Sequence, residues 1–179
     1  MNVLSLNNKL SFVNVSEERH SEKMKNIITF IACTLGVLLI GSISGLANAG
    51  NITGWYSTLQ KPSFNPPDYL FGPVWTVLYF LMGVSLFLII KTPNTEQRTT
   101  ALIIFGIQLF LNFIWSFLFF YFKLTGVAAI EIVLIWISIV FMIFTFYKLS
   151  PGAAYLQIPY FLWVSFASVL NISIWHLNI

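Results

Sequence analysis

The sequence predicts an all-α integral membrane protein, a bundle of five transmembrane helices. Hydrophobic residues make up 58% of the 179 residues and charged residues only 8%, whereas a soluble protein carries about 25% charged residues. In addition, five stretches reach the roughly 20 apolar residues that are needed to cross the hydrocarbon of a bilayer. The composition excludes a water-soluble enzyme and a disordered chain. It also excludes a nucleic-acid binder, because a net charge of +3 supplies no basic patch for phosphate groups.

The five stretches are separated by short connections that contain helix-breaking residues such as Pro93, Gly126 and Pro151. Only the fourth stretch carries a charged residue, Glu131. No connection is long enough for a second domain, so we expect a single five-helix domain over residues 24–179. The predicted helices cover about 27–49, 70–90, 100–122, 127–147 and 153–177.

Residues 1–23 are polar and show no clear periodicity, so we predict a disordered N-terminal tail. Met24 stands just before the first apolar stretch and is an alternative start to Met1. The run 47–49 fits the small-residue pattern of a signal-peptide cleavage site. The apolar stretch is longer than a signal peptide requires, and we therefore expect it to remain as the first span.

The distribution of Lys and Arg predicts the orientation in the membrane. With five spans the termini lie on opposite sides. Seven cations fall in the N-terminal segment and in the second and fourth connections, and only Lys61 and Lys123 fall on the other side. We therefore predict a cytoplasmic N-terminus and an outward-facing C-terminus, with a bacterial plasma membrane as the expected location.

Several chemistries have no support in the sequence. The single Cys33 excludes a disulfide framework, and His20 and His176 lie too far apart to suggest a metal site. No nucleophile elbow, catalytic triad or carboxylate pair is present, so we expect no hydrolytic site. Glu131 has two interpretations, a functional intramembrane acid or a carboxylate stabilised by the dipole of the fourth helix. We favour the second.

The first connection is stiff and aromatic. Pro62, Pro66 and Pro67 fix φ and lack backbone donors, and Trp55 belongs to the same segment. Aromatic residues at this position favour either an anchor at the membrane interface or a lid over a cavity.

Aromatic and amide side chains recur at helical spacing on the second, third and fifth spans. The stripes are Trp75 and Tyr79; Gln108, Asn112 and Trp115; and Trp163, Ala167 and Leu170. Each residue taken alone is more often a helix-packing or interhelical hydrogen-bonding residue. Three such stripes together predict a flat-walled apolar cavity with a few hydrogen-bond donors, which suits a large planar aromatic ligand.

Four segments carry a more specific signal, 55–67, 72–83, 108–115 and 159–171. In this order and spacing they resemble the TspO/MBR family, the tryptophan-rich sensory proteins related to the mitochondrial translocator protein. The resemblance covers the chain from about residue 24 to the end. It implies a bundle of five transmembrane helices, in agreement with the spans counted from hydropathy.

The resemblance also implies a function. Family members bind porphyrins and synthetic aromatic ligands in an intramembrane pocket that the first loop caps. It implies a haem-type tetrapyrrole as ligand, with no cofactor required, and a sensing or regulatory role. It also offers light- and oxygen-dependent porphyrin breakdown as an activity, which would depend on Trp75 and Trp163. The alternative is a passive transporter of porphyrins or other lipophilic molecules. The implied pocket residues are Trp75, Tyr79, Asn112, Trp115, Trp163, Ala167 and Leu170, and the lid residues are Trp55, Lys61, Pro62, Pro66 and Pro67.

The sequence departs from relatives at two places that concern partners. Ile172 and His176 stand where a sterol-recognition pattern has Tyr and Arg, so beyond membrane lipid we expect no sterol binding. Ile103 and Ile107 replace a small-residue motif that is linked to dimerisation in some relatives. The segment 41–45 is a GxxxG alternative for a homodimer, although we favour close packing within the chain.

Overall fold

The computed structural model describes the backbone of residues 3–179, and the side chains from Glu17 onward. All the regular structure described is helical, and five segments are long and apolar enough to cross a membrane, which confirms the predicted fold class. The helices are α1 (Val3–Asn51), α2 (Phe71–Ile90), α3 (Glu96–Ser116), α4 (Thr125–Leu149), α5 (Pro151–Tyr155) and α6 (Ile158–Leu177). Three short turns join them, the π-helical η1 (Ile52–Tyr56) and η3 (Phe117–Tyr121) and the 3₁₀-helical η2 (Asp68–Leu70).

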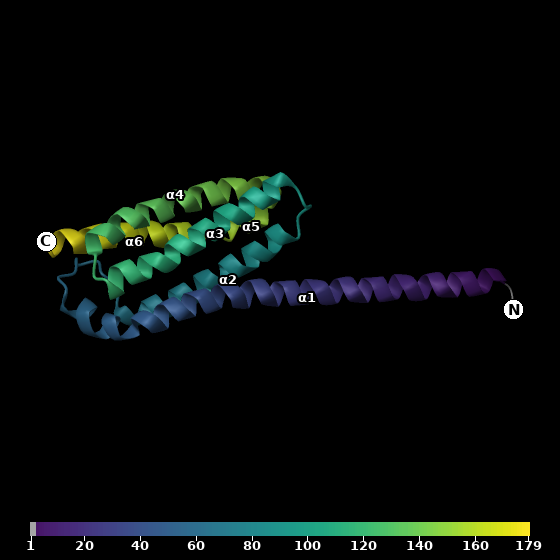
Figure 1. The fold of residues 1–179 in the computed structure, drawn as a ribbon, viewed down its shortest axis with the longest axis horizontal. Helices are drawn as coiled ribbons and strands as arrows, with labels where there is room; N and C mark the ends of the chain where they lie inside the picture. The colour runs from purple at the N-terminus through teal and green to yellow at the C-terminus, as the bar shows by residue number, and fades with distance from the viewer. Residues whose placement is uncertain (1–2) are drawn as a thin grey trace.

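The helices lie side by side in one elongated bundle (Figure 1). α1 packs against α2, α3 against α4, and α4 against α6. The connection 57–67 and the turn from η3 to α4 lie at the same end of the bundle as the C-terminus, and we call this the lid end. The α2–α3 and α4–α5 connections lie at the opposite end.

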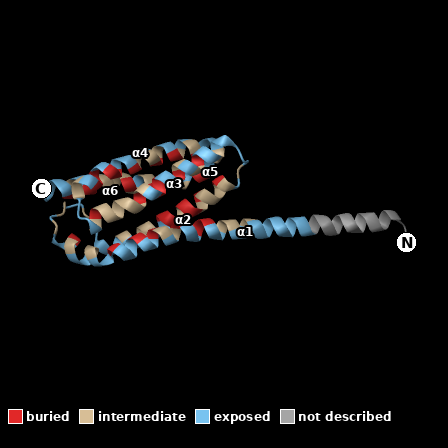
Figure 2. Ribbon diagram, in the orientation of Figure 1, coloured by how far each residue is buried: buried red, intermediate tan, exposed pale blue. Residues whose placement is uncertain are grey.

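Buried residues face the interior of the bundle, while exposed positions cover its outside (Figure 2). The core contains Met82, Ile135, Ile139 and Phe146, none of which is more than 1% exposed. The outside is also apolar, because Leu46 is 78% exposed and many other large hydrophobic side chains face outward. Such a surface is unfavourable in water and stable in lipid, so the chain is an integral membrane protein.

The first helix is longer than the sequence predicts. α1 includes residues 17–23, which are helical and exposed rather than disordered. Once a helix has nucleated, each further residue adds a hydrogen bond at little cost, and Glu and Lys side chains favour this extension. Residues 1–16 of the predicted tail lie outside the part of the chain whose side chains are described.

The fifth span is divided, whereas the sequence predicts one helix over 153–177. α5 ends at Tyr155 and α6 starts at Ile158, and the junction is a tight turn in which the Gln157 amide donates to the Ala154 carbonyl. Pro159 explains the break, because its ring excludes the carbonyl four residues earlier and its nitrogen has no hydrogen to donate. Both helices stay packed in the bundle at the break, since Ala154, Gln157 and Tyr160 are all buried.

Candidate ligand-binding cavity

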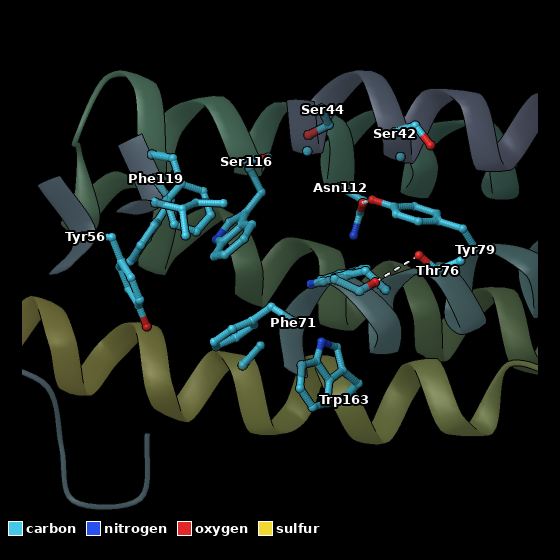
Figure 3. Close-up of a pocket in the computed structure, with 18 of the residues that line it drawn as sticks. Ser42, Ser44, Tyr56, Phe71, Thr76, Tyr79, Asn112, Ser116, Phe119 and Trp163 are labelled. Carbon is cyan, nitrogen blue, oxygen red and sulfur yellow. Dashed lines mark hydrogen bonds between the residues drawn. The ribbon is translucent and has the colours of Figure 1, made fainter. Parts of the chain in front are cut away.

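A cavity of about 480 Å³ lies inside the bundle toward the lid end, between α1, α2, α3 and α6 (Figure 3). Its volume falls in the range of about 300–1,000 Å³ that is typical of small-molecule sites. The walls are mostly aromatic and aliphatic. The seven residues that the sequence predicts as pocket residues all line it: Trp75, Tyr79, Asn112, Trp115, Trp163, Ala167 and Leu170.

Aromatic rings form two stacked pairs around the cavity. Trp75 stacks on Tyr79 with ring centroids 5.4 Å apart, and Trp115 stacks on Phe119 at 5.2 Å. Each pair comes from a single element or two consecutive ones, so the spacing predicted from sequence places the rings directly against each other. The stacked pairs provide flat, rigid walls that match a planar ligand.

The indole donors of the cavity differ in their availability. The Trp115 Nε1 donates to Asn171 Oδ1 at 3.0 Å. The Trp163 Nε1 is buried and has no hydrogen-bond partner among the residues that the structure describes. A buried donor of this kind is costly unless it is satisfied. Trp163 can therefore donate a hydrogen bond to a ligand, while Trp115 contributes only its ring.

Asn112 connects three helices at the floor of the cavity. Its Oδ1 accepts a hydrogen bond from the Tyr79 hydroxyl at 2.6 Å, and its Nδ2 donates to the Tyr160 hydroxyl at 3.0 Å. Gln108 also bonds to Tyr160, and both side chains are fully buried. The amide stripe of α3 therefore faces the bundle interior, as the sequence predicts. Asn112 shapes the floor by holding Tyr79 in place, in addition to lining the cavity.

We expect Asn112→Leu to lower the free energy of unfolding by about 1–3 kcal/mol, because the buried Tyr79 hydroxyl loses its partner and the Tyr160 hydroxyl loses one of its two. Ligand affinity should fall with it, since Tyr79 is no longer held at the cavity floor. Thermal unfolding of detergent-purified protein measures the first effect. Ser138→Ala is the control, because the Ser138 hydroxyl donates within its own helix, to the Ile135 carbonyl. Equal stability of the two variants would contradict this role of Asn112.

Tyr56 and Phe119 close the cavity at the lid end. Tyr56 is 3% exposed, packs against Phe71, Phe119 and Phe120, and donates through its hydroxyl to Asn65 Oδ1 at 2.9 Å. Both residues lie in π-helical turns, η1 and η3. A π-helical turn widens the helix and rotates the following side chains relative to an α-helix.

The connection 57–67 is fastened across this end of the bundle. The backbone of Gln60 exchanges two hydrogen bonds with the Asn178 side chain, and Phe64 packs edge-on against Phe166 of α6. These contacts join the connection to the far side of the cavity. A loop held in this way can cover a ligand.

The predicted lid residues lie at the closed lid end of the bundle, and none of them is among the residues that line the cavity. Trp55 belongs to η1 at the end of the first span and not to the loop. The helical backbone continues through η1 and ends before Pro62, the first proline of the connection. Lys61 lies over the Tyr56 ring at 4.1 Å and 3.7 Å from Asp68 Oδ1. The carbonyl groups of the prolines accept hydrogen bonds that stabilise the turns: Pro62 and Pro66 from Asn65, and Pro67 from Leu70.

The wall formed by α1 was not predicted from sequence. Gly41, Ser44 and Gly45 line the cavity. The ring of Tyr79 occupies the space that a Cβ at Gly41 would need, so this glycine packs within the chain, whereas Gly45 has open space beside it. The GxxxG pattern of residues 41–45 indicated close packing of the first span, but it does not show which helix packs against it.

The cavity has one open side. Its exposed lining residues come from α1, η2 and α2 only, whereas those from α3, η3 and α6 are buried or half-buried. The exposed set is Ser42, Gly45, Leu46, Asp68, Gly72 and Thr76. The opening therefore lies between α1 and α2, and it faces the lipid that surrounds the bundle.

Glu131 lies apart from the cavity lining. It is the seventh residue of α4 and 8% exposed, so it lies beyond the first turn, where the effect of the helix dipole is greatest. The dipole-stabilised interpretation is therefore not supported. Within the described part of the chain, no group of three His, Cys, Asp or Glu side chains could hold a metal ion.

Comparison with known proteins agrees with this arrangement. The model of the TspO/MBR family matches residues 32–176. The chain is 40% identical over 156 residues to tryptophan-rich protein TspO of Chlorobaculum tepidum, covering 86% of this chain and 98% of the relative. It is 38% identical over 154 residues to tryptophan-rich protein TspO of Archaeoglobus fulgidus (86% and 99%), and 35% identical over 150 residues to the translocator protein of Sus scrofa (80% and 89%). The chain belongs to the TspO/MBR family.

Proposed function

We propose that this protein is a membrane sensor or carrier that binds a tetrapyrrole in the cavity between α1, α2, α3 and α6. Relatives named as tryptophan-rich sensory protein and translocator protein support a sensory or transport role in a membrane. The more specific part of the proposal is that the ligand is a tetrapyrrole. One observation carries it: three tryptophans from three different helices, Trp75, Trp115 and Trp163, line a single apolar cavity.

The stacked rings, the Trp163 donor and the opening of the cavity each contribute to binding in this proposal. The stacked pairs Trp75–Tyr79 and Trp115–Phe119 contact the faces or edges of a flat macrocycle. The free Trp163 Nε1 donates to a polar atom of the ligand. The opening between α1 and α2 admits a lipophilic molecule that is dissolved in the bilayer.

The proposal includes a photochemical activity. A porphyrin held in the cavity absorbs light and, with oxygen as oxidant, generates a reactive species beside Trp75 and Trp163. The protein contributes position and exclusion of water, and the porphyrin contributes the difficult chemistry. The closed lid end keeps the reactive species next to the two indole rings.

The test is a titration of protoporphyrin into detergent-purified protein in the dark, followed by tryptophan fluorescence. We expect saturable quenching, because the ligand lies against the cavity tryptophans. Illumination of the complex in air should then reduce the porphyrin absorbance band faster than illumination of free porphyrin. Absence of saturable quenching would overturn tetrapyrrole binding.

Saturable quenching without loss of the band would favour a sensor or carrier without photochemistry. The alternative function, passive transport, makes one further prediction. Porphyrin should cross a proteoliposome membrane chemically unchanged, at a rate that rises with the amount of protein.

A further inference from the structure

The opening of the cavity forms a groove on the outside of the bundle, between α1 and α2. Away from the lid end the two helices are in direct contact. There the Tyr79 ring fills the space beside Gly41, and a Cβ at Gly83 would lie 2.6 Å from the α1 backbone. Toward the lid end, Gly45 of α1 and Gly72 of α2 are exposed lining residues, and nothing lies within 4 Å of a Cβ added to either. The two glycines therefore leave the groove open.

The groove reaches from the membrane surface into the hydrocarbon. From Gly72 to Tyr79 it follows α2 for seven residues, roughly 10 Å at 1.5 Å per residue. The 20 residues of α2 are about 30 Å long, enough to cross the hydrocarbon. Asp68 and Tyr69, which precede α2, therefore lie at the level of the lipid headgroups. Tyr69 is 74% exposed, and tyrosine is enriched at this level.

The walls of the groove offer mainly apolar surface. Leu46 of α1 is 78% exposed at the opening. On the α2 side, the Thr76 hydroxyl donates to the Gly72 carbonyl of its own helix at 2.9 Å, so it needs no outside partner. A narrow apolar groove that lies in the hydrocarbon fits an acyl chain.

Two opposite charges lie at the headgroup end of the groove. Asp68 is the only charged residue among those that line the cavity, and its side chain is 45% exposed. The Lys61 ammonium lies 3.7 Å from Asp68 Oδ1 and 4.1 Å from the centroid of the Tyr56 ring. At 3.7 Å the two charged groups attract each other but are too far apart for a hydrogen bond. Each therefore retains the capacity to bond to a further polar group.

We propose that a membrane phospholipid with a phosphoethanolamine headgroup binds in this groove. Its ammonium donates to the Asp68 carboxylate, its phosphate accepts from the Lys61 ammonium, and one acyl chain lies along Gly45 and Gly72. The bound lipid covers the open side of the cavity, and a ligand that enters from the bilayer displaces its chain. This inference goes beyond the proposed function, because it concerns a second site and a second ligand.

Charge complementarity selects this headgroup over two other common ones. A phosphoglycerol headgroup has the phosphate but no cation, so it leaves Asp68 facing a like charge. A phosphocholine headgroup has a cation without N–H groups, so it cannot donate a hydrogen bond to Asp68. Charged groups that are partly exposed to water interact modestly, and we therefore expect preferences of a few-fold.

The experiment measures the binding of single lipid molecules to detergent-purified protein by native mass spectrometry. The probes are phosphatidylethanolamine, phosphatidylcholine and phosphatidylglycerol with identical oleoyl chains, titrated in the absence of porphyrin. We expect phosphatidylethanolamine to bind about threefold more tightly than phosphatidylcholine and about fivefold more tightly than phosphatidylglycerol. Equal dissociation constants for the three lipids would overturn the inference.

Two variants separate headgroup recognition from a structural role of the ion pair. Asp68→Asn should weaken phosphatidylethanolamine by about threefold and strengthen phosphatidylglycerol by about twofold, whereas Lys61→Gln should weaken both by about threefold. Lys148→Gln is the control and should change neither, because Lys148 is exposed in the last turn of α4, at the opposite end of the bundle. If Asp68→Asn weakens all three lipids alike, the pair only holds the connection 57–67 in place and the inference is overturned.

Gly45→Leu tests the acyl-chain part of the site. A leucine fills the groove and favours the helix more than glycine does, so we expect a folded protein that binds all three lipids about fivefold more weakly. Gly106→Leu is the matched control, because it also has open space beside its Cβ but lies in α3. Thermal unfolding shows that both variants are folded. Equal lipid affinity of the two variants would overturn the groove as the binding site, and it would leave the proposed function intact because no porphyrin is present.

Discussion

Gly83→Val should separate the first two spans and strongly destabilise the bundle. Gly83 lies in α2, where a Cβ would be 2.6 Å from the Cα of Thr34 and 3.1 Å from the carbonyl oxygen of Cys33 in α1. These atoms belong to the backbone of α1 and cannot rotate away as a side chain could. The helix α1 must therefore move. We expect a loss of about 3 kcal/mol in the free energy of unfolding, at the upper end of overpacking costs. Thermal or detergent-induced unfolding of the purified protein measures it.

Gly106→Val is the matched control for this prediction. Gly106 lies in α3 and is exposed, with nothing within 4 Å of an added Cβ. The same substitution at the two glycines changes helix propensity equally, so the difference isolates the contact between α1 and α2. Similar unfolding of the two variants would show that small-residue packing between these helices does not stabilise the fold. Ligand binding should also fall in Gly83→Val, because α1 forms one wall of the cavity.

Replacing both Trp75 and Trp163 with Phe should stop porphyrin breakdown while largely preserving binding. Phenylalanine keeps an apolar ring in the cavity but is far harder to oxidise than indole. We expect the photodegradation rate to fall to that of porphyrin illuminated without protein, and the dissociation constant to rise by about threefold. Trp163→Phe alone should also abolish breakdown, and it removes a buried indole donor that has no partner among the described residues.

Trp136→Phe is the control for the tryptophan pair. Trp136 lies in α4, outside the cavity, and its Nε1 donates to Ser165 Oγ at 2.8 Å. This variant should retain both binding and breakdown. Unchanged breakdown in the Trp75/Trp163 double variant would remove both residues from the photochemistry, and equal loss of binding and breakdown would assign them to ligand binding alone.

The number and position of the spans could be predicted from sequence because the bilayer imposes a local requirement. A helix must contain roughly 20 apolar residues to cross the hydrocarbon, and each span meets this condition by itself. Local rules also predicted the aromatic stripes, since residues four apart share a helix face. Trp75 and Tyr79 illustrate this, because their stacking involves one helix only.

Three features were not predicted from the apolar pattern of the spans. The break before α6 depends on Pro159 and on the turn that Gln157 adopts. The helical residues 17–23 depend on propagation from the span that follows them. The role of Gly41 required knowing that the Tyr79 ring faces it. No periodicity within one span contains that information.

The sequence by itself determined the membrane location, the five helices and the residues that carry the family resemblance. Tertiary structure alone decided that Trp115 donates to Asn171 while the buried Trp163 donor has no partner among the described residues, and that Lys61 lies over the Tyr56 ring. The physical reason is that a span's hydrophobicity and helical periodicity are properties of consecutive residues. Hydrogen bonds and cation–π contacts between distant segments exist only once the helices have packed.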